Sequence, residues 1–366
     1  MSKEKEDIIV IGAGLTALMC ALKAQLQNPN SQVHIIAQVL PGDPPPTAWT
    51  TGASRGYHGC VKMGFSNFEE MTISNLQELS DSQPSLYHRF QHMEYFAANE
   101  IAETRLLTVS EFQVLPLDQL PEGAKHGASF LSISFDPTKV ANDILGRFLT
   151  AGGRMLRGTV RHIQEVIEAG TTAFEKATNS GEEVLRPPAA ILVCVGLGAR
   201  FIGGLEDTGV FPIRMQALKL RAPWIVTGQA YYNNETAPIL SIVPLSNGDV
   251  LVSGEHVLND WFGKPRRSAT ELLLEKAGQI CPALIPHDAD SKLGLRSLLV
   301  WEGCDIFAGR KNGPRLDIET FQIHGSLRRV PVIWCYGYGA AETQSFMGIA
   351  ESAINLLQAA IEQARL

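Results

Sequence analysis

The sequence predicts an α/β fold, in which a doubly wound parallel sheet is interleaved with a second, antiparallel layer. Three stretches predict it: a strand, glycine turn, helix and second strand at residues 8–37; a glycine-rich strand end at residues 189–205; and a hairpin at residues 237–261. A chain of 366 residues is longer than one average domain. It therefore forms either two lobes or one large α/β unit with an inserted layer.

Composition and charge exclude several classes of protein. Apolar residues make up 45% and charged residues 19%, and the net charge is -7, so there is no electrostatic reason to expect a nucleic-acid partner. The polar start "MSKEKED" runs directly into a strand, and no apolar run reaches membrane-spanning length. We predict no membrane partner and a location inside the cell, cytoplasmic by default.

The six cysteines are scattered along the chain, with neither a C-x-x-C pair nor a tight Cys/His group. This spacing predicts no metal site and no disulfide framework. Most of the cysteines are expected to be buried free thiols.

The first element is a βαβ unit. A buried strand at Ile8–Ile11 leads through a glycine turn into a helix, and a second strand follows at Val33–Ala37. The helix repeats Leu or Met at i, i+3, i+4, i+7 and i+11 from Leu15, which gives one apolar stripe to lie on a parallel sheet.

The glycine turn carries a dinucleotide fingerprint. Gly12 allows the tight turn, Gly14 lets the backbone approach a pyrophosphate, and Ala17 takes the third, close-packing position. Leu15, at the start of the helix, belongs to the same predicted site, because the helix N-terminus favours phosphate charge. The alternative is a purely structural turn, which the position between two strands disfavours.

The end of the second strand lacks the acidic residue that usually binds ribose hydroxyls. Gln38 stands there instead, as a neutral substitute. No basic residue follows on that strand end, so an NADP site is not indicated.

The remaining elements follow in order along the chain. They are a glycine-rich loop at 50–60, a helical region from 66 to about 110, a helix at 137–153, a strand at 158–163, a solvated acidic loop at 168–183, an apolar strand running into Gly196, the hairpin, a helix at 268–284, a strand ending near Ile306, a strand at 330–339 and a helix from Glu342. The second glycine-rich strand end favours FAD over NAD, since an NAD-only enzyme usually has no counterpart.

Several motifs together resemble the D-amino-acid oxidase family of FAD-dependent oxidoreductases over nearly the whole chain. They are "VIGAGLTAL", "VHIIAQVLPGD", "VGLGARFIGGLED", "IVPLSNGDVLVSGEHVLNDW", "GPRLDIE" and "YGYGAAETQSFMGIAES". The resemblance implies a doubly wound, Rossmann-type FAD-binding domain interleaved with an antiparallel-sheet substrate domain, and the flavin ring at their junction. We assign 1–60, 137–215 and 293–366 to the first domain, and 61–136 and 216–292 to the second.

The resemblance also implies the chemistry. Hydride passes from a carbon bearing an amine to flavin N5, dioxygen reoxidises the flavin to give peroxide, and the imine hydrolyses. The expected partners are a small-molecule substrate and dioxygen, with a homodimer as the assembly to test. We expect FAD to be non-covalent, because nothing beside Cys60 argues for a thioether. Further cofactor contacts implied by the resemblance are Gly52, Val160, Gly196, Gly339, Ala340, Thr343 and Gln344.

The family's carboxylate clamp is absent. In family members an Arg-Pro dipeptide precedes the "GPRLDIE" turn, and that Arg binds the substrate α-carboxylate; the two positions here are Phe307 and Ala308. A family Tyr that also binds the carboxylate aligns with Ser241. Charge-assisted hydrogen bonds contribute about 1.5–3 kcal/mol each, so the loss should cost about two to three orders of magnitude for an amino acid. A roomier, apolar pocket is expected.

The side chains singled out for substrate binding or acid–base work are Arg55, Tyr57, His58, Ser241, Glu255, Phe307 and Glu342. Glu342 replaces a family glycine, and is either a new acid/base or an exposed residue. His58 is either a base or a hydrogen-bonded bystander. The basic residues Arg310, Lys311 and Arg315 are interpreted as a solvated or structural turn.

Three hypotheses follow. The first is a tailoring oxidase or oxidative cyclase of secondary metabolism, acting on a bulky, largely apolar substrate. The second keeps oxidation of a small amine or amino acid, which either lacks the usual carboxylate contact or is bound through Arg55. The third is a non-redox FAD-binding cyclase or scaffold. The C-terminal Ala364-Arg365-Leu366 is either a peroxisomal address or a frayed helix end.

Overall fold

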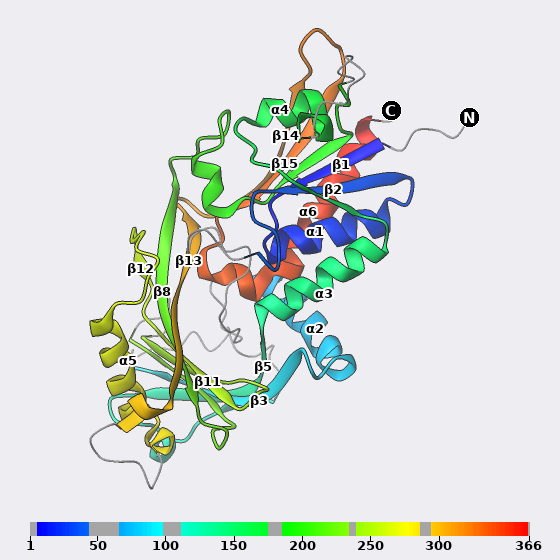
Figure 1. Cartoon of the computed structure of the whole chain (residues 1–366). Coiled ribbons are helices and arrows are strands. Elements are labelled where there is room, and N and C mark those ends of the chain that lie inside the picture. Colours follow the sequence, from blue (N-terminus) through cyan, green and yellow to red (C-terminus); the bar gives the residue numbers. More distant parts are fainter. Residues whose placement is uncertain are drawn as a thin grey trace. The chain divides into compact units, whose positions relative to one another are not determined.

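The computed structural model describes residues 6–43, 66–97, 111–174, 185–233, 239–285 and 294–364 (Figure 1). The chain divides into two compact units. The first consists of Met1–Ala53, Thr138–Pro212 and Phe307–Leu366, and the second of Ser54–Pro137 and Ile213–Ile306.

The last segment of the first unit begins at Phe307, whereas we expected residue 293. The difference has a physical cause. Strand β13 (Leu299–Arg310) pairs with β8 (Val210–Arg221) in the antiparallel sheet, so residues before Phe307 belong to the second unit.

The first unit is built on a six-stranded sheet in the order β14-β15-β7-β1-β2-β6. Its elements are β1 Glu6–Ile11, α1 Leu15–Gln27, β2 Ser31–Ala37, α3 Pro137–Thr150, β6 Arg154–Arg157, α4 Ile163–Ala169, β7 Ala190–Val193, β14 Arg315–Gln322, β15 Arg329–Tyr336 and α6 Glu342–Ala364. All neighbours are parallel except β14, which runs antiparallel to β15. Helices α1 and α6 pack side by side on this sheet (Figure 1).

The apolar composition of β1, β7 and β15 follows from their central position. Residues Ile8–Val10 and Ala190–Val193 have no exposed surface. A parallel strand with neighbours on both sides and layers over both faces needs apolar side chains at consecutive positions, rather than an alternation.

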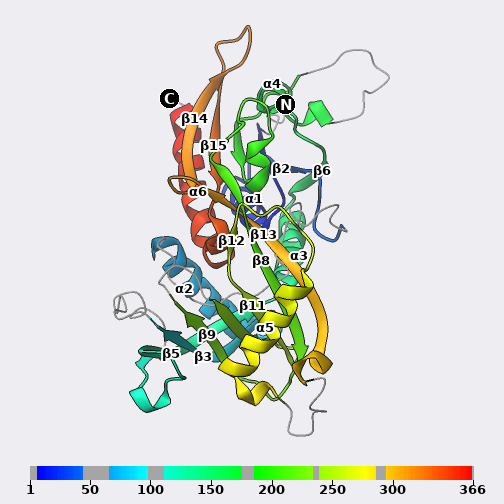
Figure 2. The same cartoon turned by 90° about the vertical axis from the view of Figure 1, so that its left-hand side faces the viewer.

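The second unit is built on a nine-stranded sheet in the order β12-β8-β11-β10-β9-β3-β5-β4, with β13 on β8. Its further elements are α2 Ser66–Ser82, β3 Tyr87–Phe96, β4 Gln113–Val114, β5 His126–Phe135, β9 Gly228–Tyr232, β10 Leu240–Pro244, β11 Asp249–Gly254, β12 Val257–Leu258 and α5 Arg267–Ile280. Helix α5 covers one face of this sheet (Figure 2), where Leu273 and Leu274 pack with Leu240, Ile242 and Val252.

The predicted βαβ unit and the hairpin are confirmed. Strand β10 pairs with β11 from Leu240–Gly254 to Pro244–Val250, across the turn at residues 245–248. Gly248 lies in the left-handed region with φ 82°, as such a turn requires.

The predicted helix from 66 to about 110 is wrong beyond Ser82. Residues 87–96 form β3, which pairs with β5 over all ten positions from Tyr87–Phe135 to Phe96–His126. Aromatic side chains favour a strand, and the ladder to β5 decides the conformation. Residues 98–110 lie outside the described ranges.

Three other predicted elements differ from the structure. The strand expected at 158–163 lies earlier in the chain, as β6 at Arg154–Arg157. The end of the expected range belongs to α4 instead, because His162 Nδ1 accepts from Gln164 N–H and caps that helix. The acidic loop expected from 168 begins with the end of α4 and a 3-10 helix at Gly170–Phe174. The helix at 268–284 is interrupted at Cys281, since Pro282 starts a separate 3-10 turn.

Substitution of Gly12 tests the first turn of the parallel unit. We expect Gly12→Ala to lower the free energy of unfolding by about 2 kcal/mol or more, because φ is 111° and the new Cβ would lie 2.2 Å from the Cys194 carbonyl oxygen. Chemical denaturation measures the change.

The matched control is Gly146→Ala, in the middle of α3. Nothing lies within 4 Å of a Cβ at Gly146, and alanine favours a helix, so this variant should gain about 0.5 to 1 kcal/mol. Equal stability of the two variants would contradict the close approach at Gly12.

Candidate functional site

Three glycine turns lie along one edge of the parallel sheet. Strands β15, β7 and β1 are adjacent and parallel, so their carboxyl ends lie at the same edge. Gly12 follows β1, Gly196 follows β7 and Gly339 follows β15, and their φ angles are 111°, 52° and 64°. All three glycines adopt left-handed backbone that other residues rarely adopt. The structure therefore gathers the three predicted cofactor turns at one place.

The turn after β1 leads directly into a helix N-terminus. Gly14 occupies the N-cap of α1 and has no side chain to accept from the first amide groups of the helix. Leu15 and Ala17 are buried. The first amide groups of α1 are then available to an anion, which the helix dipole favours. This arrangement suits a pyrophosphate.

Glu342 joins the first and third turns. Thr16 Oγ1 of α1 donates to Glu342 Oε1 at 3.0 Å, at the start of α6. Glu342 keeps part of its surface exposed, but burial of the carboxyl group raises its pKa to about 7. A carboxyl that titrates near neutral pH at this edge has the property expected of an acid/base group.

The remaining residues predicted at this helix start are partly or fully buried. Thr343 is buried and Ala340 half-buried. Gln344 Oε1 is buried and has no hydrogen-bond partner among the described residues. A buried amide oxygen without a partner indicates a ligand contact at this position.

The end of β2 is more charged than the sequence indicated. Gln38 is exposed, and its carbonyl oxygen accepts from Arg157 Nη1 at 3.2 Å. Arg157 also forms a two-pronged pair with Asp43, at 2.6 and 3.0 Å, which lowers the pKa of Asp43 to about 2. Val160, predicted as a cofactor contact, lies half-buried just after β6.

The two arginines of the turn at 310–315 pair with acidic residues, as their interpretation as a structural turn predicts, and Lys311 is exposed. Arg310 Nε donates to Asp207 Oδ2 at 2.7 Å, and Tyr336 donates to the same oxygen at 3.0 Å. Arg315 bonds to Asp317 and Glu319. Neither arginine offers a free guanidinium to a substrate carboxylate.

In the second unit, Ser241 belongs to a row of residues that crosses the antiparallel sheet. Ser241 on β10 lies opposite Ala230 on β9 and Ser253 on β11, and Ala230 lies opposite Glu94 on β3. Directly paired residues project from the same face of a sheet. Ser241, Ser253 and Glu94 therefore share a face, together with Ala217 on β8.

This face is opposite to the one covered by α5, and an apolar cluster lies on it beside the polar residues. Phe90, Val243 and Leu251 pack on it with Ala217, and Trp301 packs against them. Ser241 is 2% exposed, and its Oγ has no hydrogen-bond partner within the described ranges. A small hydroxyl side chain thus lies in an apolar environment with its polar atom unsatisfied.

Glu94 is a fully buried titratable group on this face, with a strongly raised pKa. It is 1% exposed, Tyr232 donates to its Oε1 at 3.2 Å, and burial raises its pKa to about 8. His92 is buried beside it, and burial lowers the His92 pKa to about 3. The 3.8 Å between His92 Nε2 and Glu94 Oε1 is therefore not an ion pair, because both groups are uncharged at neutral pH.

Glu255 and Phe307, two other predicted substrate residues, do not belong to this row. Glu255 is exposed and pairs with Lys276 at 3.3 Å. Phe307 is half-buried in β13. Arg55, Tyr57, His58 and Gly52 lie outside the described residues.

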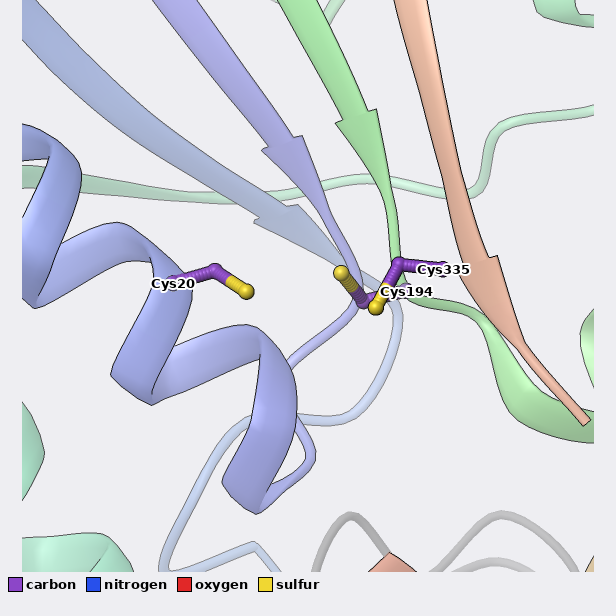
Figure 3. Close-up of side chains that lie close together, drawn as sticks. All are labelled: Cys20, Cys194 and Cys335. Carbon is purple, nitrogen blue, oxygen red and sulfur yellow. The ribbon is translucent and has the colours of Figure 1, made fainter. Parts of the chain in front are cut away.

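The described cysteines are free thiols, three of them buried, as predicted, but three that are scattered along the sequence lie close together in space. The sulfur atoms of Cys20, Cys194 and Cys335 all lie within 4.8 Å of one another. They come from α1, the residue after β7, and β15, and Figure 3 shows the side chains facing each other. We call these three residues the thiol cluster. The spacing of 174 and 141 residues hides it in the sequence, because only the parallel sheet brings the segments together.

Sequence reasoning also missed Glu94 and Tyr232. The alternation of aromatic and polar residues in "YHRFQHMEYF" is typical of a strand, and reading it so would have placed His92 and Glu94 on one face.

Comparison with known proteins agrees with this architecture. The model of the family described as FAD dependent oxidoreductase matches residues 7–356. The D-aspartate oxidase of Cryptococcus neoformans var. grubii is 27% identical, with 95% of this chain and 96% of that protein covered. The D-amino-acid oxidase of Schizosaccharomyces pombe is 22% identical, with 97% and 98% covered.

Solved structures share the fold. The L-proline dehydrogenase of P. horikoshii has a TM-score of 0.70 at 12% identity, covering 97% of this chain and 94% of that one. The glycine oxidase of Bacillus cereus has a TM-score of 0.68 at 12% identity, covering 97% and 95%. None of the described helices is both long and apolar enough to cross a lipid bilayer.

Glu94 predicts a pH dependence of stability. Its folded pKa, about 8, is above the ordinary 4.5, so the folded state binds the proton more tightly than the unfolded state. The stabilisation is complete below pH 4.5 and is lost as the pH rises through 8, by at most about 5 kcal/mol. Denaturation between pH 5 and 9 should show this slope, and Glu94→Gln should lose the part between pH 7 and 8, which lies above the pKa of about 7 of the other buried carboxyl, Glu342.

Two variants sharpen this test. Tyr232→Phe removes the hydrogen bond that lowers the Glu94 pKa, so the slope should extend to higher pH. Glu255→Gln, at an exposed carboxylate, should leave the slope unchanged. A Glu94→Gln protein with the wild-type slope would assign it to another group.

Proposed function

Because the chain belongs to the family of FAD-dependent oxidoreductases, we propose that it removes hydride from a carbon of a bulky, largely apolar substrate. The product class would be that of a natural-product tailoring oxidase or oxidative cyclase. The enzyme class and the FAD cofactor follow from the family, and the substrate class is the new step.

The observation that carries the proposal is Ser241. In the family that this chain resembles, a Tyr at this position binds the substrate carboxylate. Here the position holds a small, buried serine, on the same sheet face as the apolar cluster of Phe90, Val243, Leu251 and Trp301. Such a surface favours an apolar ligand, with a few polar groups to orient it. Phe307, at the clamp position, has no hydrogen-bond donor for a carboxylate.

Glu94 and Tyr232 supply the polar group on the same face. A protonated carboxyl donates one hydrogen bond, and once ionised it accepts from a cation. Burial beside an amine-bearing substrate would favour the ionised form by charge pairing. This supports an amine, or a carbon activated by a neighbouring hydroxyl, as the oxidised group.

The described residues fit the FAD that the family implies. The glycine turns at Gly12, Gly196 and Gly339, with the N-terminus of α1, would hold the pyrophosphate end, and Gln344 Oε1 lacks a partner that the cofactor would provide. Bound FAD supplies the hydride acceptor. Glu342, with a pKa of about 7, is able to hold or release a proton at its carboxyl near neutral pH, and Thr16 keeps that carboxyl in place.

Oxidation of an amino acid is the second candidate, and the similarity to the D-aspartate oxidase favours it. A small amine or amino acid would then be bound without the usual clamp, through Arg55. The oxidoreductase family and its oxidase relatives give no support to a non-redox scaffold.

We further propose dioxygen as the oxidant and the peroxisome as the location. Peroxide as a product and the C-terminal Ala364-Arg365-Leu366 support this. A fluorescent protein fused in front of the chain should be imported into peroxisomes, and deletion of the last three residues should return it to the cytosol. A cytosolic full-length fusion would contradict the address.

The substrate class is tested by anaerobic reduction of the bound flavin. We expect bulky arylalkylamines and phenols to bleach the flavin, and D-aspartate and D-alanine to do so at least about a hundredfold more slowly, as the missing clamp requires. Rapid bleaching by either D-amino acid would overturn the proposal in favour of the second candidate.

Ser241→Tyr adds the bulk that the proposal says is absent. It should slow bleaching by the bulky compounds by at least about tenfold, because the ring adds bulk on the sheet face that carries Phe90 and Val243. Ser246→Tyr, at the exposed turn of the same hairpin, is the control and should react as wild type does. Equal rates for both variants would remove Ser241 from the site.

A further inference from the structure

We propose that Cys20, Cys194 and Cys335 form a binding site for copper(I) inside the FAD-binding unit. The oxidation described above does not use these thiols. The names of the relatives reported above mention no metal.

The geometry fits a three-coordinate ion. All three sulfur atoms lie within 4.8 Å of one another. Three sulfurs in a plane around an ion, at metal–sulfur distances near 2.3 Å, are about 4 Å apart. The upper limit of 4.8 Å is less than 1 Å above that spacing, and the three side chains lie next to one another (Figure 3).

Each thiol stands on a rigid element. Cys20 lies in α1 with no exposed surface, and Cys335 lies in β15 and is 2% exposed. Cys194 N–H donates to the Ile11 carbonyl oxygen at 2.9 Å, which fixes the residue after β7 against β1. A site built on a helix and adjacent strands is held in shape before the ion arrives.

The donor set selects the metal. Within the part of the chain that the structure describes, this group of three contains only thiols, without imidazole or carboxylate. Soft thiolate ligands select copper(I) over hard cations, whereas a structural zinc site takes four ligands. Burial of Cys20 and Cys335 leaves little access for a water molecule as a fourth ligand.

The neighbourhood offers an outer hydrogen bond. Tyr338 Oη lies 3.9 Å from Cys335 Sγ, so the hydroxyl can donate to the sulfur when it is ionised. Binding forms three copper–sulfur bonds and releases to solvent one proton for each thiol that ionises. The oxidation state of copper does not change, so no oxidant or reductant is required.

The thiol cluster is adjacent to the three glycine turns. The Cys194 carbonyl oxygen is the atom that a Cβ at Gly12 would meet at 2.2 Å. Gly196 follows Cys194 by two residues, and Gly339 follows Tyr338 directly. Simple core packing explains one buried cysteine as a small apolar residue, but gives no reason for three sulfurs from three elements to converge.

The test is an anaerobic titration of the purified, FAD-loaded full-length protein with copper(I) held by a chromophoric chelator. We expect the protein to remove one copper ion per chain from the chelator. X-ray absorption of the loaded protein should show three sulfur neighbours and no nitrogen or oxygen ligand.

Serine variants identify the ligands. Cys20→Ser, Cys194→Ser and Cys335→Ser should each lose the copper binding, because a hydroxyl is a hard ligand. Cys281→Ser, at a buried thiol of the other unit, should keep it. Circular dichroism and FAD content establish that each variant is folded. Cys194 is partly buried, whereas Cys20 and Cys335 are fully buried, so the Cys194 variant is expected to disturb the core least.

Three results would overturn the proposal. The first is no transfer of copper from the chelator to the wild-type protein. The second is transfer that persists in both Cys20→Ser and Cys194→Ser. The third is a four-coordinate zinc ion that copper(I) does not displace, which would assign the site to a different metal.

Discussion

Parallel pairing of β1 with β7, and of β7 with β15, is the interaction on which the rest of the first unit depends. It aligns three segments far apart in the sequence, so that each ends at one edge of the sheet. The edge then needs backbone that turns sharply without a side chain, and glycine supplies it at Gly12, Gly196 and Gly339. The same pairing brings the thiol cluster together, because two of its residues follow or belong to these strands.

In the second unit, the register of the antiparallel strands decides which residues lie together. Its antiparallel ladders fix which side chains share a face, and a shift by one residue would exchange the apolar layer under α5 with the row containing Ser241 and Glu94. The row is buried and largely uncharged, since the Glu94 carboxyl is protonated at neutral pH. A sheet face that combines an apolar cluster with a buried, uncharged carboxyl favours ligands that match it in size and make a polar contact.

Acidic groups are used in two opposite ways. Asp207 and Asp43 accept from arginines, and those contacts stabilise loops. Glu342 and Glu94 have no cationic partner among the described residues, and burial raises the pKa of each. Charged pairs therefore explain the arginines of the turn at 310–315, and the unpaired carboxyls are the groups suited to chemistry.

The sequence by itself determined the βαβ unit, the glycine turns, the hairpin and the family, because each of these depends on local spacing of apolar residues and glycines. It did not determine the strand at Tyr87–Phe96, where ten pairings with β5 decide between helix and strand. Nor did it show that Glu94 lies in the row of Ser241, or that Cys20, Cys194 and Cys335 meet. Those neighbours are separated by up to 315 residues, and only the register of paired strands and the packing of helices on them bring such residues together.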